Sequence, residues 1–154
     1  MQNCIAVLGF ATKCSDANQV TAYEVGRQIA LGDYTACAGN STGTFPHVFT
    51  GAKSVNGHTL AVLEAGVTVL DETPCDAVIY APDSDAKHQL IADKCLAAIV
   101  IGGGHGTKKL ITQFLNLDKP VVAIAGSGGV VIGELDARVK VVDPECFSIK
   151  ELCL

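Results

Sequence analysis

The chain has 154 residues, 49% of them hydrophobic and 18% charged, which is enough to bury the core of a globular domain. Aromatic residues make up only 5% and tryptophan is absent, so the core must be mainly aliphatic. The net charge of −5 argues against general nucleic-acid binding, which needs a basic surface, although a local cluster of backbone amides can still bind a small anion.

The N-terminal segment combines a buried strand with an amphipathic helix. Cys4–Gly9 is a continuous apolar run and is predicted to be a strand that ends in Gly9-Phe10-Ala11-Thr12. Either Ser15 or Asp16 can cap the helix that follows, and Gly32 is a natural stop just beyond its end. The apolar positions with helical spacing are Ala22, Val25 and Ile29.

A second strand and helix follow in the same order. Tyr34–Ala38 is predicted to be a strand, and it leads into the glycine- and hydroxyl-rich segment Gly39–Thr44. A helix is expected from there to about Val55. The turn Asn56-Gly57 then introduces a third strand, His58–Leu63.

The C-terminal half repeats the alternation. Asp76–Tyr80 is predicted to be a strand, Ser84–Lys94 a helix, and Leu96–Ile101 a strand that runs directly into Gly102–Thr107. The next helix has one apolar face and must end before Pro120, because proline disfavours a helical residue before it. That face is formed by Leu110, Ile111, Phe114 and Leu115.

Two further strands are expected, Val121–Ala125 and Val139–Val142. Continuous apolar strands separated by helices are typical of a parallel sheet covered on both faces. The sequence therefore predicts a single α/β domain over residues 1–154, Rossmann-like and doubly wound, with a mostly parallel sheet. Ligands of such sheets bind beyond the carboxyl ends of the strands, where the glycine clusters lie.

The glycine-rich segments Gly39–Thr44 and Gly102–Thr107 are the main candidates for a ligand site. Glycine lets a ligand approach the backbone, and a helix N-terminus offers unpaired N–H groups that suit phosphate. The alternative is that these glycines only permit tight turns. The segment Gly102–Lys109 is not a Walker A loop, and GxGxxG does not occur, so a P-loop or dinucleotide fingerprint is unsupported.

Charge placement adds one candidate. Lys87 and His88 are expected in the first turn of one helix, and Lys108 and Lys109 in the first turn of the next. Cations there oppose the helix dipole unless an anion is bound, although solvated lysines can tolerate the small cost. Lys87 is the preferred ligand contact. Serine hydrolase chemistry is not supported, because Ser127 has no assignable base.

The seven cysteines form no CxxC pair and no metal-ligand spacing. We expect buried, reduced thiols, no metal site and a cytoplasmic location. The N-terminus lacks a basic leader, and no apolar run approaches the length of a membrane span, so neither a signal peptide nor membrane association is expected.

Gly103-Gly104-His105-Gly106-Thr107 resembles the PGGxGTxxE signature of the LOG ("Lonely guy") phosphoribohydrolases, long mislabelled lysine decarboxylases, within the wider SLOG group. The resemblance covers most of the chain and is strongest to short bacterial members and molybdenum cofactor carrier proteins, which keep a GGG form. Gly102 replaces the proline of the LOG form. The similar segments are 7–11, 22–32, 39–52 and 96–122.

The resemblance implies a Rossmann-like fold, a phosphorylated ligand and a homodimer or higher homo-oligomer. It also implies lost catalysis, because Leu110 stands at the catalytic glutamate position and Lys87 at the arginine position. That carboxylate would stabilise positive charge on the ribose as the N-glycosidic bond breaks, and leucine cannot. The predicted ligand- or phosphate-binding residues are Gly9, Phe10, Ala11, Gly39, Asn40, Ser41, Thr42, Gly43, Lys87, Gly102, Gly103, Gly104, His105, Gly106 and Thr107.

Three hypotheses remain. The first is a protein that binds a nucleotide or a molybdopterin-type cofactor without phosphoribohydrolase activity. The second is an active nucleoside 5′-monophosphate phosphoribohydrolase that uses another acid, with Asp83 or Asp85 as candidates. The third is a non-catalytic scaffold subunit whose glycine segments are turns.

Overall fold

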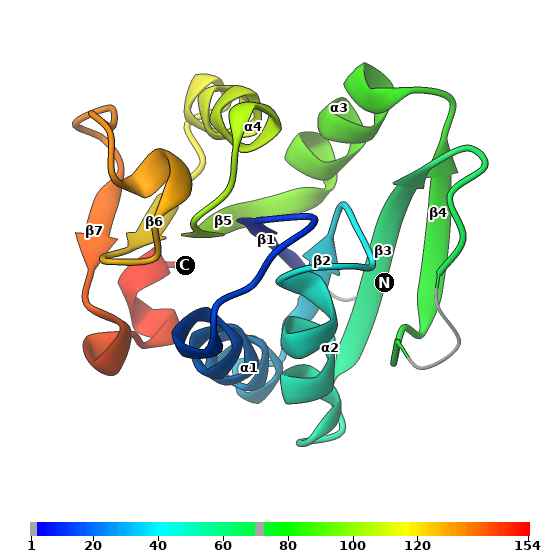
Figure 1. Cartoon of the computed structure of the whole chain (residues 1–154), viewed down its shortest axis with the longest axis horizontal. Coiled ribbons are helices and arrows are strands. Elements are labelled where there is room, and N and C mark those ends of the chain that lie inside the picture. The colour runs from blue at the N-terminus through cyan, green and yellow to red at the C-terminus, as the bar shows by residue number, and fades with distance from the viewer. Residues whose placement is uncertain (1–2, 70–72) are drawn as a thin grey trace.

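The computed structural model describes residues 3–69 and 73–154. Its strands form one seven-stranded sheet in the order β4-β3-β2-β1-β5-β6-β7, with every neighbouring pair parallel (Figure 1). The strands are β1 (Cys4–Gly9), β2 (Thr35–Ala38), β3 (His58–Glu64), β4 (Ala77–Ala81), β5 (Cys95–Ile101), β6 (Val121–Ile124) and β7 (Lys140–Val142).

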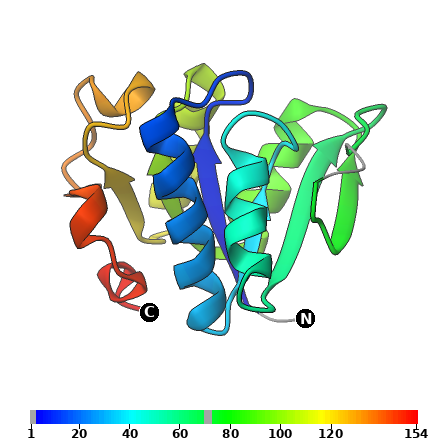
Figure 2. The ribbon, with the colours of Figure 1, turned by 60° about the horizontal axis from the view of Figure 1, so that its bottom comes forward.

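Helices cover both faces of the sheet. Helices α1 (Asp16–Leu31) and α2 (Phe45–Lys53) lie side by side on one face, and α3 (Ser84–Lys94) and α4 (His105–Asn116) lie on the other (Figures 1 and 2). Short 3₁₀ helices follow at Gly129–Val131, Pro144–Cys146 and Ile149–Leu152. This confirms the predicted doubly wound, Rossmann-like α/β fold. None of the described helices has the length and apolar character that crossing a membrane requires.

The central strands are apolar on both sides, which explains their continuous hydrophobic runs. In β1, Ile5 and Val7 pack into the core beneath α1 and α2, while Ala6 and Leu8 pack into the core beneath α3 and α4. Side chains alternate in this way because successive residues of a strand point to opposite faces. Each face of β1 is therefore fully buried.

One of the two predicted N-cap residues caps helix α1. The hydroxyl of Ser15 accepts a hydrogen bond from Asn18 N at 3.2 Å, so Ser15, not Asp16, is the N-cap. The helix ends at Leu31 with Gly32 as its C-cap, as the sequence predicts, and the φ of Gly32 is −82°. Asp33 adopts the left-handed conformation instead, with φ of 64°. A short polar side chain tolerates that region better than most residues do.

Helices α1 and α2 touch backbone to backbone through two glycines. A Cβ atom added to Gly26 would lie 1.9 Å from Val48 O, and one added to Gly51 would lie 1.9 Å from Tyr23 O. No other residue fits at either position without moving one helix away from the other. The contact holds α2, and so the segment that precedes it, close to the end of β1.

All seven cysteines are free in the described residues. Cys4, Cys37 and Cys95 are buried, as predicted. The prediction of burial is wrong for Cys146 and Cys153, which are exposed near the C-terminal end of the chain.

The strand order places a switch point between β1 and β5. From β1 the chain moves outward to β4, then returns to the other side of β1 with β5 and continues outward to β7. Gly9 and Ile101 are register partners at the carboxyl ends of these two strands. The segments that follow them diverge to opposite faces, which leaves a crevice suited to a ligand.

Candidate ligand-binding site

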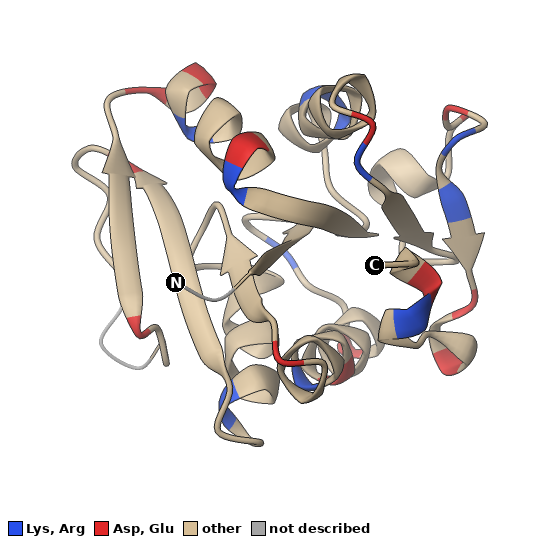
Figure 3. Cartoon of the chain, turned by 180° about the vertical axis from the view of Figure 1, so that it is seen from behind, with Lys and Arg blue, Asp and Glu red and all other residues tan. Residues whose placement is uncertain are grey.

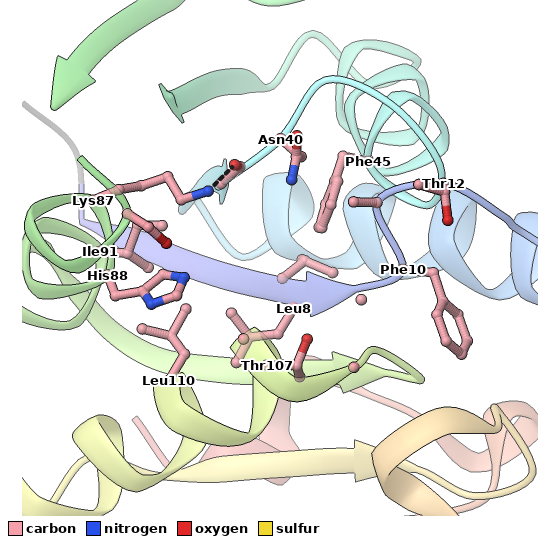
Figure 4. Close-up of a pocket in the computed structure, with 17 residues that line it drawn as sticks. Leu8, Phe10, Thr12, Asn40, Phe45, Lys87, His88, Ile91, Thr107 and Leu110 are labelled. Atoms are coloured by element: carbon pink, nitrogen blue, oxygen red, sulfur yellow. Dashed lines mark hydrogen bonds between the residues drawn. The ribbon is translucent and has the colours of Figure 1, made fainter. Parts of the chain in front are cut away.

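A cavity of about 370 Å³ lies at this switch point, within the usual size range of small-molecule sites. It is bounded by the ends of β1 and β2 and by the first turns of α3 and α4 (Figure 4). The predicted site residues that line it are Gly9, Phe10, Ala11, Gly39, Asn40, Lys87, Gly104, Gly106 and Thr107. Ser41, Thr42, Gly43, Gly102, Gly103 and His105 do not line it.

The N-terminus of α4 opens into this cavity. The helix begins at His105, inside the predicted glycine-rich segment Gly102–Thr107, with Gly104 as an N-cap that supplies no side-chain hydrogen bond. Within the described residues, the N–H groups of 104–107 have no protein acceptor. Thr107 is less than one-tenth exposed, and no residue in the described ranges hydrogen-bonds its hydroxyl, which is turned toward the cavity (Figure 4). Four amides and one hydroxyl therefore remain free to hold an anion.

Gly102 and Gly103 shape the turn that places these amides. Their φ angles are 71° and 96°, which other residues rarely adopt. Gly102 N donates to Ser127 Oγ at 2.9 Å, and Ser127 donates to Ile124 O at 2.6 Å. Gly103 O accepts from Val130 N at 3.0 Å. Ser127 therefore ties the β6 loop to the α4 turn.

The second half of the first glycine segment supports the cavity from behind. Thr42 Oγ1 donates to Ala11 O at 2.5 Å, and Thr44 N donates to Phe10 O at 2.9 Å. A Cβ atom on Gly43 would lie 2.2 Å from Phe10 O, so the two loops pack directly on each other. Only Gly39 and Asn40 of this segment reach the cavity.

Lys87 is buried in the cavity wall and already has two partners. Its ammonium donates to Gly39 O at 3.2 Å (Figure 4), and it lies 3.4 Å from a carboxylate oxygen of Glu64. The sequence predicts Lys87 as a contact for an anionic ligand and gives no indication of Glu64. No sequence signal joins these residues, because Glu64 ends β3 and Lys87 lies in α3. The sequence did predict that the ligand site lies beyond the carboxyl ends of the strands, where Glu64 is found.

The prediction that Lys108 and Lys109 lie in the first turn of α4 is wrong. Because α4 begins at His105, they are its fourth and fifth residues, and both are exposed. The prediction is wrong in the same way for Lys87 and His88, which are the fourth and fifth residues of α3. His88, by contrast, lies in the cavity (Figure 4). Burial is the main cause that lowers the pKa of His88, followed by the charge of Lys87. The sequence feature that could have placed His88 in the cavity is its position next to Lys87, as the fifth residue of the predicted helix.

The acids considered for hydrolysis lie away from the cavity lining. Leu110, at 4% exposure, lines the cavity at the position expected for a catalytic glutamate. Asp83 caps α3 by accepting a hydrogen bond from Ala86 N at 2.8 Å, and Asp85 is exposed on the same helix. Among the described residues, no Asp or Glu lines the cavity.

Comparisons with known proteins agree on family and fold. The SLOG cluster4 family model matches residues 2–145. No curated protein matches the sequence. The chain is similar to the Moco carrier protein of Chlamydomonas reinhardtii, with 27% identity, a TM-score of 0.74, and coverage of 94% of this chain and 92% of that one.

Two further solved structures share the fold. The molybdenum cofactor binding protein of the phototrophic bacterium Rippkaea orientalis is 22% identical, with a TM-score of 0.76 and coverage of 94% of this chain and 92% of that one. DNA processing protein A of Streptococcus pneumoniae is 18% identical, with a TM-score of 0.70, over 94% of this chain and 60% of that one.

Proposed function

Because the chain belongs to the SLOG cluster4 family, we propose that it binds a small phosphorylated ligand, a nucleotide or a molybdopterin-type cofactor, without hydrolysing it. The observation that carries this proposal is the cavity at the β1/β5 switch point. The free amides of Gly104, Gly106 and Thr107 and the buried hydroxyl of Thr107 open into it. A phosphate group at this position would complete hydrogen bonds that the described part of the chain leaves open.

The space at Gly104 favours this interpretation over a simple turn. A Cβ atom added to Gly104 would meet no heavy atom within 4 Å, and Gly104 has no positive φ. Neither a positive φ nor crowding therefore requires glycine here. A need for close approach by a ligand would explain it.

The likeness to the Moco carrier protein of Chlamydomonas reinhardtii supports a molybdopterin-type cofactor as one candidate ligand. A nucleotide is the other, and both carry phosphate on a larger ring system. The rest of the cavity suits such a ring, because Leu8, Phe45, Ile91 and Leu110 supply apolar surface beside the polar Asn40. These residues would bind and orient the ligand.

The lining also favours binding without hydrolysis. Cleaving an N-glycosidic bond requires a carboxylate near the developing positive charge on the ribose. The cavity presents Leu110 there, and Asp83 is committed to capping α3. The hydrolase hypothesis therefore lacks a positioned acid among the described residues.

Native mass spectrometry of the purified protein would identify a retained ligand, and calorimetry with AMP would test binding directly. The decisive variant is Gly104→Val, which would fill the anion position, with the Tm measured beside it to show that the variant folds. The matched control is Gly133→Val, at an exposed glycine whose added Cβ would meet only Val130 O, at 3.8 Å. We expect Gly104→Val alone to abolish AMP binding. Equal binding by both variants would mean that the glycine segments serve only as turns, and it would favour the scaffold hypothesis.

Self-association, cytoplasmic location and a single domain over 1–154 remain predictions. Val20 and Leu31 of α1 are 72% and 54% exposed, and Tyr23 lies on the same stripe of that helix, which suits a contact with a second copy.

Basic and acidic residues are interspersed over the chain in Figure 3 and do not separate into a basic and an acidic side. We therefore retain the expectation that nucleic acid is not the ligand.

A further inference from the structure

His88 lines the cavity together with Gly104, Gly106 and Thr107 of the first turn of α4. A Cβ atom added to Gly106 would lie 3.6 Å from His88 Cε1 and 3.8 Å from Nε2, so the space between the ring and this turn is about the size of one added side-chain atom. No hydrogen bond holds either ring nitrogen within the described residues. The imidazole thus stands beside the same free amides and the same unpartnered hydroxyl of Thr107 that form the anion site (Figure 4).

The charged groups around His88 come from three elements. On its own helix, Lys87 lowers the pKa of the imidazole and Asp85 raises it; Lys109 of α4 lowers it and Glu64 of β3 raises it. Burial is the largest influence and also lowers the pKa. The pKa of the imidazole is therefore lowered, and in the ligand-free protein the site disfavours its protonated form. An anion placed on the adjacent amides would favour the protonated form.

We propose that His88 is a ligand-binding residue that donates a hydrogen bond to the anionic group at the N-terminus of α4, so that the affinity for a doubly charged oxyanion rises as the pH falls. This inference rests on the proposed function and adds its regulation by pH. Binding takes up a proton on the imidazole, and by linkage the protonated protein binds more tightly. The ligand class is a compact dianion such as a phosphate monoester.

Sulfate is the appropriate probe, because it stays a dianion while histidine titrates between about pH 5 and 8. NMR would follow the amides of 104–107 for binding and the Cε1 proton of His88 for its titration. If sulfate raises the pKa of His88 by about one unit, its affinity must be about tenfold higher at the acid end of that range. His88→Gln should bind sulfate with little pH dependence.

The matched control is His58→Gln, at an exposed residue that begins β3 at the opposite end of the sheet. It should keep the pH dependence of the wild type. Sulfate binding that is equally tight across the range, or a His88 titration unaffected by sulfate, would overturn the role of His88 and leave the proposed function standing. No sulfate-induced shift at 104–107 at any pH would overturn both.

Discussion

The ammonium of Lys87 lies 3.4 Å from the carboxylate of Glu64, and of these two residues only the lysine lines the cavity. Lys87 is 8% exposed, whereas the Glu64 side chain is 41% exposed. The pair therefore leaves the lysine facing the cavity while its charge is largely offset. An incoming phosphate must compete with Glu64 for the lysine.

Glu64→Gln should therefore strengthen the binding of AMP by about two- to fivefold, the range expected for one screened charge. The glutamine keeps the size of the side chain and removes only its negative charge. Calorimetry at fixed ionic strength would measure the change, and Glu24→Gln on α1 is the control, since Glu24 pairs only with neighbours on its own helix. Weaker binding by Glu64→Gln would mean that the pair is needed to position Lys87.

Incubation with AMP, GMP, CMP or UMP should release no free base above a protein-free blank. The physical reason is that Leu110 cannot stabilise the oxocarbenium-like charge that develops on the ribose. Chromatography of the reaction mixture would quantify the base. Turnover at enzyme-like rates that disappears in Asp83→Asn or Asp85→Asn would instead establish the hydrolase hypothesis.

Asp76 should make a pH-dependent contribution to stability. Burial alone would raise the pKa of Asp76, but hydrogen bonds from Lys53 Nζ at 2.9 Å and Thr59 N at 2.9 Å outweigh it and hold the pKa below its usual value. Because the folded-state pKa is lowered, this stabilisation is present above the unfolded-state pKa and is lost as the pH falls through the folded-state pKa.

Asp76→Asn is therefore expected to lower the free energy of unfolding at neutral pH by about 1 kcal/mol, a value reduced for solvent screening. The difference from the wild type should shrink in acid. Urea unfolding at several pH values would measure it, with Asp143→Asn as a control at an exposed position. A difference that is the same at every pH would show that the charge of Asp76 contributes nothing.

Much of the fold was predictable because each strand is a short apolar run that ends in glycine or another turn residue. The start of α4 was not, because glycines are poor helix formers and the pattern placed Gly106 in a loop. In the structure Gly106 belongs to the first turn, and a Cβ added there would make only ordinary contact with His88, at 3.6 Å.

The site was only partly predictable for a related reason. The backbone amides of 104–107 follow from the order strand, glycines, helix, which is a local pattern. The partners of Lys87 come from β2 and β3, far along the chain, and are decided by strand order. Strand order is a tertiary property, so the sequence could suggest Lys87 but not Glu64.

The close contact between α1 and α2 leads us to expect an unusual effect of Gly51→Ala on stability. Alanine in place of a helical glycine ordinarily stabilises by up to about 1 kcal/mol. Here the new Cβ would lie 1.9 Å from Tyr23 O, so the helices must separate, and we expect a net destabilisation of about 1–3 kcal/mol. Thermal unfolding would show this as a lower Tm.

Gly106→Ala in α4 provides the contrast, because its Cβ would meet only His88, at 3.6 Å and beyond. That substitution should leave the Tm unchanged or raise it. Since α2 begins at Phe45, which lines the cavity, Gly51→Ala should also weaken AMP binding by displacing that ring. A Tm for Gly51→Ala equal to that of Gly106→Ala would mean that α1 and α2 separate at no cost, and the close contact would then not be what positions the cavity wall.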